Sequence, residues 1–399
     1  RNIRRNIRRT LITLGAVCVG LAAIILFFGF NNGFHESWLA QTLKLQSGHV
    51  VINAPGYRDD PKLSNYMEDP EPAFSALDKA EGITAYAPRV DAHGLVSTAE
   101  NSVGVLIRGI DLEREKDLTG VNERIVEGEG LTGESGGIIL GFRLAKKLNA
   151  TIGDKVVLMI QAADGSIGAE LYRLKGTFKL GMMEMDGSIA VISIDDAREL
   201  AVIGTGVTEI AALSSDPRAV DPIVDSLSAT LSKEAFDVVS WEVALGALME
   251  LMQLDYVFMY FLLAIVLVIV SLGIVNTMLM SILERTRELG IMMALGTSPR
   301  VIVFLIVLES LVIAVIGTLA GVALGIGANE LIAINGLDLS RWSEGFEMFA
   351  AIDPVVYPIN DYIHVFYSSL AVFFTTVIVS LYPAIKAARL KPVEAIHFV

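Results

Sequence analysis

The sequence from residue 256 to 283 is YVFMYFLLAIVLVIVSLGIVNTMLMSIL. It carries no charge, and it exceeds the roughly 20 apolar residues that a helix needs to cross a bilayer. A buried helix of a soluble protein keeps a polar stripe. Residues 264–270 show no such stripe. This stretch therefore predicts a transmembrane helix.

Three further apolar stretches have comparable length. Residues 11–30 and 365–385 are uncharged, and residues 301–329 are interrupted only by Glu309. The composition agrees, because 53% of the 399 residues are hydrophobic, 19% are charged and the mean hydropathy is +0.56. Soluble domains carry about 25% charged residues. We expect a membrane protein with four transmembrane α-helices and a large α+β periplasmic domain inserted between helices 1 and 2.

The charges that flank these stretches predict the topology. Five arginines precede the first stretch, whereas residues 33–255 hold 35 acidic and 19 basic residues. Because positive charge favours the cytoplasmic side, we expect both termini in the cytoplasm and residues 33–255 in the periplasm. The expected segments are a basic entry with helix 1 (1–32), the periplasmic domain (33–255), helix 2 (256–283), a cytoplasmic element (284–300), helix 3 (301–329), a periplasmic loop (330–363), helix 4 (364–385) and a cytoplasmic tail (386–399).

The first apolar stretch differs from a signal peptide. It exceeds the usual 7–15 apolar residues, and no small-residue cleavage site follows Phe30. We expect an uncleaved anchor. The chain opens at Arg1 rather than Met, so we also expect a short N-terminal piece to be missing.

The region from 33 to 255 has mixed patterning. Asp164-Gly165 is a turn signal suited to a hairpin. We expect strands at 48–53, 103–109, 156–160 and 189–194, and helices at 144–148 and 222–231. This pattern predicts an α+β domain.

Signals for catalysis are absent from the sequence. The single cysteine, Cys18, forms no disulfide, and the sequence contains no Gly-Lys dipeptide and therefore no Walker A phosphate loop. The five histidines do not pair at metal-ligand spacing, and we expect each to lie at the surface or to be satisfied in the core. A net charge of -14 argues against nucleic-acid binding. We expect no metal, no cofactor and no enzymatic activity in this chain.

In the segment 284–300, ERTRELGIMMALGTSPR, charged, apolar and helix-ending residues follow one another in separate groups. Its charges fill the first turn and apolar residues follow, so it can lie at the membrane surface. Gly296 predicts a helix stop, Ser298 an N-cap and Pro299 the first position of the next helix. The residues presented to a cytoplasmic partner would be Glu284, Arg285, Arg287 and Glu288. The alternative is an ordinary connector whose arginines set the topology.

Small and polar residues mark positions inside the predicted spans. Gly317, Gly321 and Gly325 lie on one face of the third span and permit close helix packing. Glu309 should face protein or water rather than lipid. Asn276 is expected to make an interhelical polar contact.

Several of these motifs resemble a known family. The segment 284–300, the tail YPAIKAARLKPVEAI (382–396) and the arginine-rich entry resemble those of the MacB/FtsX-like ABC transporter permeases. Within that group the outer domain is most similar to the lipoprotein-releasing Lol-type (LolC/LolE-like) permeases. The matching segments are VGVLIRGID (103–111), IILGFRLAKKL (138–148), GDKV (153–156) and KGTF (175–178). The stretch 161–172 is shorter than the hook that receives a periplasmic carrier in one Lol permease.

The resemblance implies a permease of the bacterial inner membrane without an ATP site. It implies a dimer with an identical or related chain, bound to two copies of a separate ABC ATPase that holds ATP and Mg. ATP-driven closure would pass along the helices to the outer domains. The substrate would be a lipoprotein or a similar amphiphile, taken from the outer leaflet, and a lipoprotein would be handed to a soluble carrier. The residues that couple to the ATPase would be Glu284, Arg285, Arg287, Glu288, Leu289 and Gly290.

Moving an acyl chain from the bilayer into water costs about 0.8 kcal/mol for each exposed CH₂ group. A lipoprotein-releasing site must therefore provide an apolar surface that replaces the bilayer. Aromatic residues and methionines at the outer ends of the first two spans could provide an adaptable apolar surface. These residues are Phe27, Phe28, Phe30, Phe34, Met249, Met252, Tyr256, Phe258, Met259 and Tyr260. The alternative is that they anchor the helices at the membrane interface.

Two other functions remain open beside lipoprotein release. One is a MacB-like tripartite efflux permease that works with a periplasmic adaptor. The other is an FtsX-like mechanotransmitter that regulates cell-wall hydrolases and moves no substrate. Such transmitters have much smaller outer domains than residues 33–255.

Overall fold

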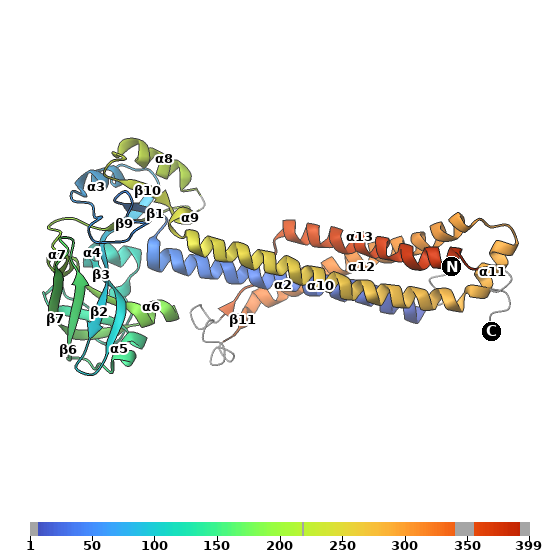
Figure 1. Ribbon diagram of the computed structural model, residues 1–399, viewed down its shortest axis with the longest axis horizontal. Coiled ribbons are helices and arrows are strands. Elements are labelled where there is room, and N and C mark those ends of the chain that lie inside the picture. The colour runs from blue at the N-terminus through green and yellow to red at the C-terminus, as the bar shows by residue number, and fades with distance from the viewer. Residues whose placement is uncertain (1–6, 218, 340–354, 392–399) are drawn as a thin grey trace. The chain divides into compact units, whose positions relative to one another are not determined.

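The computed structural model describes residues 7–217, 219–339 and 355–391. The chain divides into two compact units, a helical unit (Arg1–Glu36, Leu251–Leu339 and Val355–Val399) and a sheet unit (Ser37–Glu250 and Ser340–Pro354). Among the described residues, four helices are long and apolar enough to cross a membrane. They are α2 (Ile7–Thr42), α10 (Gly246–Glu284), α12 (Pro299–Asn335) and α13 (Tyr362–Ala388) (Figure 1).

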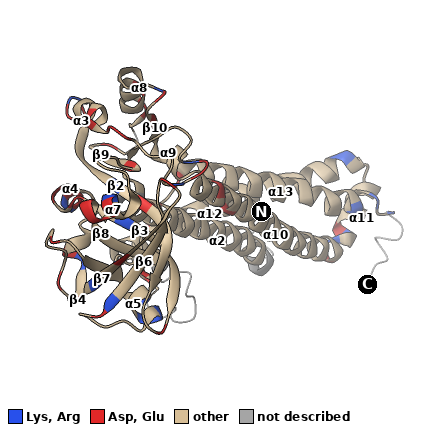
Figure 2. Cartoon of the chain, turned by 60° about the vertical axis from the view of Figure 1, so that its left-hand side comes forward, with Lys and Arg blue, Asp and Glu red and all other residues tan. Residues whose placement is uncertain are grey.

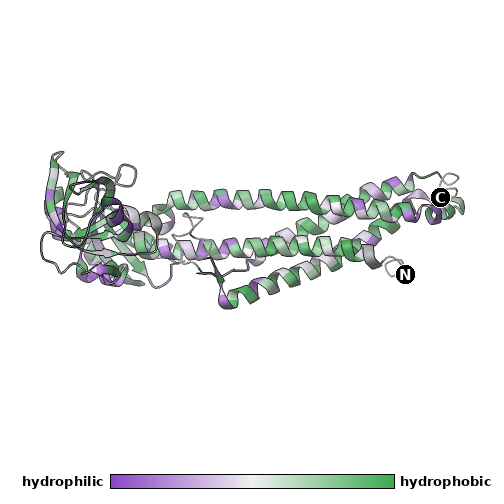
Figure 3. Ribbon diagram, turned by 90° about the horizontal axis from the view of Figure 1, so that it is seen from below, coloured by the Kyte–Doolittle hydropathy of each residue, from purple (hydrophilic) through white to green (hydrophobic). Residues whose placement is uncertain are grey.

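The four helices confirm the predicted spans and extend beyond them. Helix α2 continues to Thr42 rather than ending near residue 32, and α10 begins at Gly246 rather than at 256. The uncharged stretches identify only the residues that must lie in the hydrocarbon of the membrane. The helices are longer because they can continue past the membrane into water. Hydrophobic colour covers most of each long helix in Figure 3. The compact sheet unit accordingly begins at Ser37 and ends at Glu250, inside the predicted range 33–255.

The glycines of α12 pack against α2, as the spacing predicted. A Cβ at Gly317 would meet the Val17 side chain at 2.9 Å, and one at Gly325 would meet Ile25 Cβ at 2.8 Å. A Cβ at Gly321 would lie 3.0 Å from the backbone oxygen of Cys18. The three glycines therefore let two helix backbones approach closely.

Short elements connect the long helices. Helix α11 (Thr286–Ala294) follows α10, and Gly296 ends it with a φ of +98° that favours glycine. Ser298 is the residue before α12 and Pro299 its first residue, as expected. Strands β11 (Leu337–Asp338) and β12 (Val355–Val356) pair beyond α12. The arginines at 1, 4 and 5, residues 340–354 of the predicted loop and residues 392–399 of the tail lie outside the described residues.

The part of the sheet unit that the structure describes is built on ten strands. Six of them, β2, β3, β8, β5, β7 and β6, pair in that order, and β6 also pairs with β2, so the pairings close a ring. A closed ring leaves no exposed edge between its members. The bounds are β1 (Val50–Asn53), β2 (Ile83–Ser97), β3 (Ser102–Ile110), β4 (Ile125–Gly128), β5 (Gly137–Gly141), β6 (Lys155–Gln161), β7 (Ile167–Phe178), β8 (Ile189–Ser193), β9 (Glu209–Ser214) and β10 (Asp237–Ser240).

Strand β2 is long enough to join the ring to a second set of strands. Its first half pairs with β9, which continues to β1 and β10, and its second half pairs with β3 and β6. The predicted hairpin at Asp164-Gly165 connects β6 to β7. The short helices of this unit are α3 (Glu71–Leu77), α4 (Leu112–Leu118), α5 (Phe142–Leu148), α6 (Met183–Ser188), α7 (Ile194–Ala201), α8 (Asp221–Thr230) and α9 (Trp241–Ala244). A π-helical turn forms at Leu43–Ser47 and a 3₁₀ turn at Val121–Glu123. The α+β prediction is confirmed.

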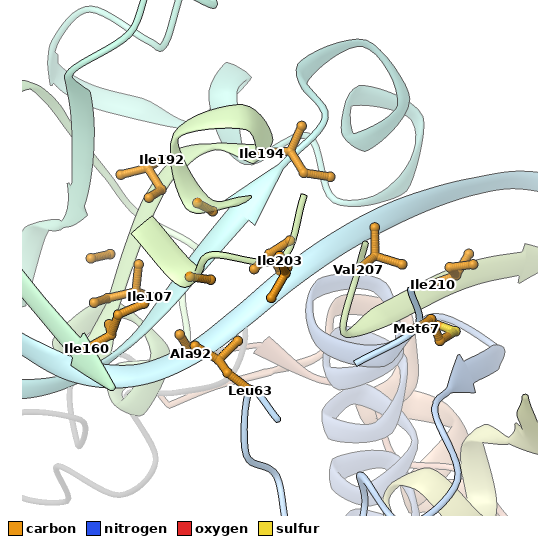
Figure 4. Packing of buried hydrophobic residues seen from close by; sticks show 14 of the residues in the cluster. Leu63, Met67, Ala92, Ile107, Ile160, Ile192, Ile194, Ile203, Val207 and Ile210 are labelled. Carbon is orange, nitrogen blue, oxygen red and sulfur yellow. The ribbon is translucent and has the colours of Figure 1, made fainter. Parts of the chain in front are cut away.

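Apolar side chains from both sets of strands share one core. Strand β6 buries alternate residues, Val156, Leu158 and Ile160, as a strand with one covered face should. Figure 4 shows Ile107 and Ile160 with Ile192 around the ring, and Met67, Val207 and Ile210 continuing the same cluster.

A buried ion-pair network crosses this unit. Arg89, which is 0% exposed, donates from Nη2 to Glu115 Oε1 at 2.7 Å and from Nη1 to Glu209 Oε1 at 3.1 Å. Arg108 makes a two-pronged pair with Asp91, at 2.9 Å and 2.7 Å. These residues come from β2, β3, β9 and α4, so the network ties strands far apart in sequence.

The glycine contacts predict a position-specific loss of stability. Gly321→Leu should cost about 1–3 kcal/mol, because the new side chain meets the α2 backbone. Gly327→Leu is the matched control on α12, since a Cβ there would meet nothing within 4 Å. Thermal unfolding in detergent measures both. Equal unfolding temperatures for the two variants would contradict the close packing of α12 on α2.

The buried network predicts a second, larger loss. Arg89→Met should destabilise the sheet unit by about 3–5 kcal/mol, because Glu115 and Glu209 keep buried charges without their cation. Arg58→Met is the control, since the Arg58–Asp237 pair is about one-third exposed (33% and 34%) and such pairs contribute about 1 kcal/mol or less. Urea unfolding of the full-length protein, followed by tryptophan fluorescence, compares them. An Arg89 variant as stable as the control would show that the network does not hold the unit together.

Candidate functional site

The corner between α10 and α11 contains an ion pair inside the helical unit. Arg285 separates the two helices, with φ -103° and ψ 10°. Its Nη1 donates to Glu309 Oε2 on α12 at 3.3 Å, and the two side chains are only 17% and 22% exposed. Glu309 thus faces protein, as expected. Arg285 differs from expectation, because it turns toward α12 to neutralise that acid instead of facing outward.

A cavity of about 390 Å³ lies at the same corner. Arg285, Glu288 and Glu309 supply its charged lining, and the remaining lining is mainly aliphatic side chains and methionines from α10, α11 and α12. The ion pair therefore stands at the wall of a cavity rather than in closely packed core.

The short helix α11 has two different sides. Glu284, which ends α10, and Arg287 and Glu288 in α11 are exposed. Leu289 packs with a small apolar cluster of Ile282, Ile302 and Ala387, and Gly290 is buried. Figure 2 shows positions of charged residues around α11, whereas the middle of the long helices is mostly uncharged. Of the six predicted coupling residues, Glu284, Arg287 and Glu288 are exposed, and Glu288 also lines the cavity. The other three face the bundle.

Aromatic rings predicted at the outer ends of the spans meet around a histidine. His364 stacks on Phe28 with ring centroids 5.3 Å apart and on Tyr256 at 5.6 Å. Tyr260 lies 6.2 Å from the same ring. Rings from α2 and α10 thus pack on the first turn of α13.

Carboxylates pair with His364 and with His35, whose ring centroid lies 5.3 Å from that of Tyr256. His35 Nε2 lies 3.0 Å from Asp255 Oδ2, and His364 Nδ1 lies 2.8 Å from Asp361 Oδ2. Burial opposes ionisation of Asp361, but the N–H of Ile363 and the His364 ring outweigh it, so the pKa of Asp361 lies below its ordinary value. The expectation that these histidines are satisfied is confirmed for His364. For His35 it holds only at Nε2, because Nδ1 is buried and has no hydrogen-bond partner among the described residues.

The ten residues predicted to form a substrate surface fall into different environments. Phe27, Phe258 and Tyr260 are exposed at 43%, 57% and 45%. The others are buried or half-buried: Phe28, Met252 and Met259 are buried, Phe30, Phe34 and Tyr256 are half-buried, and Met249 packs on the core of the sheet unit. Only Phe27, Phe258 and Tyr260 therefore expose a large aromatic side chain on the outer surface of the helical unit.

Asn276 does not make the interhelical contact expected of it. Its side chain is exposed on α10 and forms no hydrogen bond with residues 7–217, 219–339 or 355–391. Within those same ranges, no group of three or more His, Cys, Asp or Glu side chains is arranged to hold a metal ion.

Comparison with known proteins gives two family matches that together cover most of the chain. Residues 10–230 match the MacB-like periplasmic core domain, and residues 260–392 match the FtsX-like permease C-terminal region. The first region contains most of the sheet unit, from its start to the end of α8, and the second contains α11.

Named relatives match over nearly the whole chain at low identity. The lipoprotein-releasing system transmembrane protein LolC of Neisseria meningitidis is 25% identical over 98% of this chain and 94% of its own length. LolE of Haemophilus influenzae is 22% identical, covering 95% and 92%. The macrolide export ATP-binding/permease protein MacB of Hyphomonas neptunium is 26% identical over 99% of this chain, which spans 59% of that protein.

The order of the elements agrees with these matches, since the sheet unit follows the first apolar helix and three apolar helices follow the sheet unit. The chain is therefore a member of the FtsX-like permease family that carries a MacB-like periplasmic core domain, an ABC transporter permease of the LolC, LolE and MacB type.

Proposed function

We propose that this chain is the permease subunit of an ATP-driven transporter and that α11 is the element on which a separate ABC ATPase acts. The observation that carries the proposal is the two-sided character of α11. Its exposed charges, Arg287 and Glu288, provide a polar surface, and Leu289 on its other side is packed into the bundle.

The contacts of α11 explain how a force on it would be transmitted. The Arg285–Glu309 pair joins the start of α11 to α12, and the cluster around Leu289 reaches Ala387 of α13. The hydroxyl of Thr286 donates to the Ile282 carbonyl at 3.1 Å, which holds α11 to the last turn of α10. A displacement of α11 must therefore move α10, α12 and α13. ATP and Mg would be held by the partner, which we propose is present in two copies.

We base the proposed topology on the distribution of charged residues along the chain. The termini and α11 would face the cytoplasm of a bacterium and the sheet unit its periplasm, with the four long helices in the inner membrane. The long uncharged stretches and the charge bias of the segments between them support this orientation.

We propose a lipoprotein as the cargo, taken from the outer leaflet and passed to a periplasmic carrier. Relatives named as lipoprotein-releasing proteins match 98% and 95% of this chain. Exposed aromatic side chains at Phe27, Phe258 and Tyr260 offer apolar area that could receive an acyl chain.

Macrolide export is the second candidate, because MacB relatives match the chain over nearly its whole length. Purification in native lipid followed by mass spectrometry separates the two candidates. A copurified triacylated protein supports lipoprotein release, and a copurified adaptor without lipoprotein supports export.

Charge reversal at Glu284, the last residue of α10, and at Glu288 of α11 should uncouple the ATPase. The double variant Glu284→Lys/Glu288→Lys should reduce copurification of the ATPase about tenfold or more, since reversed charges at an interface cost several kcal/mol. Glu68→Lys/Glu234→Lys is the control, because both acids are exposed on the sheet unit. If the α11 variant bound the ATPase and transported normally, α11 would not be the docking element.

Replacing an exposed aromatic ring should slow release of the cargo. Phe258→Ser should lower the rate of lipoprotein release about tenfold, because it removes roughly 1.5 kcal/mol or more of apolar contact. Leu319→Ser is the control, since Leu319 is 66% exposed on α12, away from the predicted surface. Release from proteoliposomes to a carrier measures both, with ATPase copurification checked in parallel. Equal rates for Phe258→Ser and the unaltered protein would remove this residue from the site.

A further inference from the structure

The proposed function does not use the cavity at the corner of α10, α11 and α12. Its volume of about 390 Å³ lies within the roughly 300–1,000 Å³ typical of small-molecule sites. Buried side chains such as Ile282 and Ile302 form part of its wall, and every described lining residue belongs to the helical unit. A space of this size with mainly aliphatic walls can hold a ligand with an apolar body.

The cavity extends along the apolar part of α12. Its lining residues on this helix run from Ile302 to Val312, which is about 15 Å along a helix. This length equals about half of the ~30 Å hydrocarbon core of a bilayer, so it matches one leaflet. Leu305 and Leu308 line the cavity and are each 44% exposed, so the cavity opens to the outside of the helical unit. An acyl chain of a lipid in the surrounding membrane can therefore reach it.

A helix of another chain is too wide for this cavity. A helix with its side chains is about 10 Å across, so a segment about 15 Å long occupies roughly 1,200 Å³, about three times the available volume. A single acyl chain is thinner and flexible. The side chains of Met278 and Met292 in the lining can adapt their shape to an apolar ligand. The shape of the cavity therefore favours a lipid chain over a protein segment.

The charged side chains of the lining indicate which head group would accompany that chain. Glu288 and Glu309 are the acids and Arg285 is the base of the described lining, so it carries two negative charges and one positive charge. Glu309 already accepts a hydrogen bond from Arg285 at 3.3 Å. The second acid, Glu288, is exposed in the first turn of α11, where charged residues follow the apolar part of α10. This arrangement favours a head group that carries a positive charge.

Phosphatidylethanolamine has the matching chemistry. Its primary ammonium, like that of lysine, has three N–H donors for a carboxylate, and its phosphate is a group that an arginine fork binds. We propose that this cavity binds one acyl chain of a phosphatidylethanolamine molecule, with the ammonium beside Glu288 and the phosphate beside Arg285. Phosphatidylcholine lacks the N–H donors, and phosphatidylglycerol lacks the cation. The inference goes beyond the proposed function, because it requires only that the long helices span a membrane.

Native mass spectrometry of the full-length chain tests the identity of the lipid. The chain is reconstituted in liposomes that hold equal amounts of phosphatidylethanolamine, phosphatidylcholine and phosphatidylglycerol with the same acyl chains, and it is then extracted. Phosphatidylethanolamine should be retained about fivefold or more over each of the others, the effect of one charge-assisted hydrogen bond at a partly exposed site. Equal retention of the three lipids, or a preference for either of the others, would overturn the proposal.

Filling the cavity tests the position of the lipid. Ser281 lines the cavity from α10, so Ser281→Trp should lower the retention of phosphatidylethanolamine about tenfold, because the acyl chain loses apolar contact with the cavity wall. Ala264→Trp is the matched control, since Ala264 is exposed on the same helix and is not among the described residues that line the cavity. Equal retention by the two variants would place the lipid elsewhere and contradict the proposal.

Removing one lining charge tests the head-group contact without changing the shape of the cavity, and it does so even if Ser281→Trp does not fold. Glu288→Gln should lower the retention of phosphatidylethanolamine relative to phosphatidylcholine about fivefold. Glu284→Gln is the control and should leave the ratio unchanged, because Glu284 is also exposed but lies outside the described lining. An unchanged ratio in the Glu288 variant, or an equal change in both variants, would overturn the head-group contact. The chain is measured without an ATPase, so the outcome is separate from whether α11 binds one.

Discussion

The fold depends on the cost of placing charge in hydrocarbon. Each long helix contains a stretch that is uncharged or nearly so, and the acid inside such a stretch, Glu309, is paired with Arg285. That pair lies where α10, α11 and α12 meet, so it also fixes the corner that presents α11. One requirement, that a carboxylate near the membrane must be neutralised, thus shapes the proposed docking element.

The local features of the fold could be predicted from sequence because their signals are local. Uncharged length identified the four long helices, the glycine spacing of α12 identified its contact face, and period-2 patterning located strands such as β6. The closure of the six-stranded ring could not be predicted, because it depends on β2 pairing with β6 some sixty residues later. The same holds for Arg89, whose partners Glu115 and Glu209 lie on separate elements.

In the candidate sites too, some features could be predicted from nearby residues and others depend on residues far apart in the sequence. The exposed charges of α11 follow from helical periodicity, but the direction of Arg285 depends on an acid 24 positions away on another helix. At the outer end, the aromatic residues were predicted as an apolar surface. The structure instead places Phe28 and Tyr256 on His364 and pairs His35 with Asp255, more than 200 positions away. Because Phe28 and Tyr256 pack on His364, the exposed apolar area near this end of the helices is smaller than the sequence predicted.

The central claim is that the long helices connect a cytoplasmic α11 to a periplasmic sheet unit. The most direct measurement is labelling of single cysteines by a membrane-impermeant maleimide in spheroplasts of the Cys18→Ala protein. Ile167→Cys and Leu295→Cys are suitable, because these positions are 80% and 83% exposed, in the sheet unit and after α11. The account predicts that position 167 reacts in intact spheroplasts and that position 295 reacts only after permeabilisation. Labelling of position 295 from outside, or protection of position 167, would contradict it.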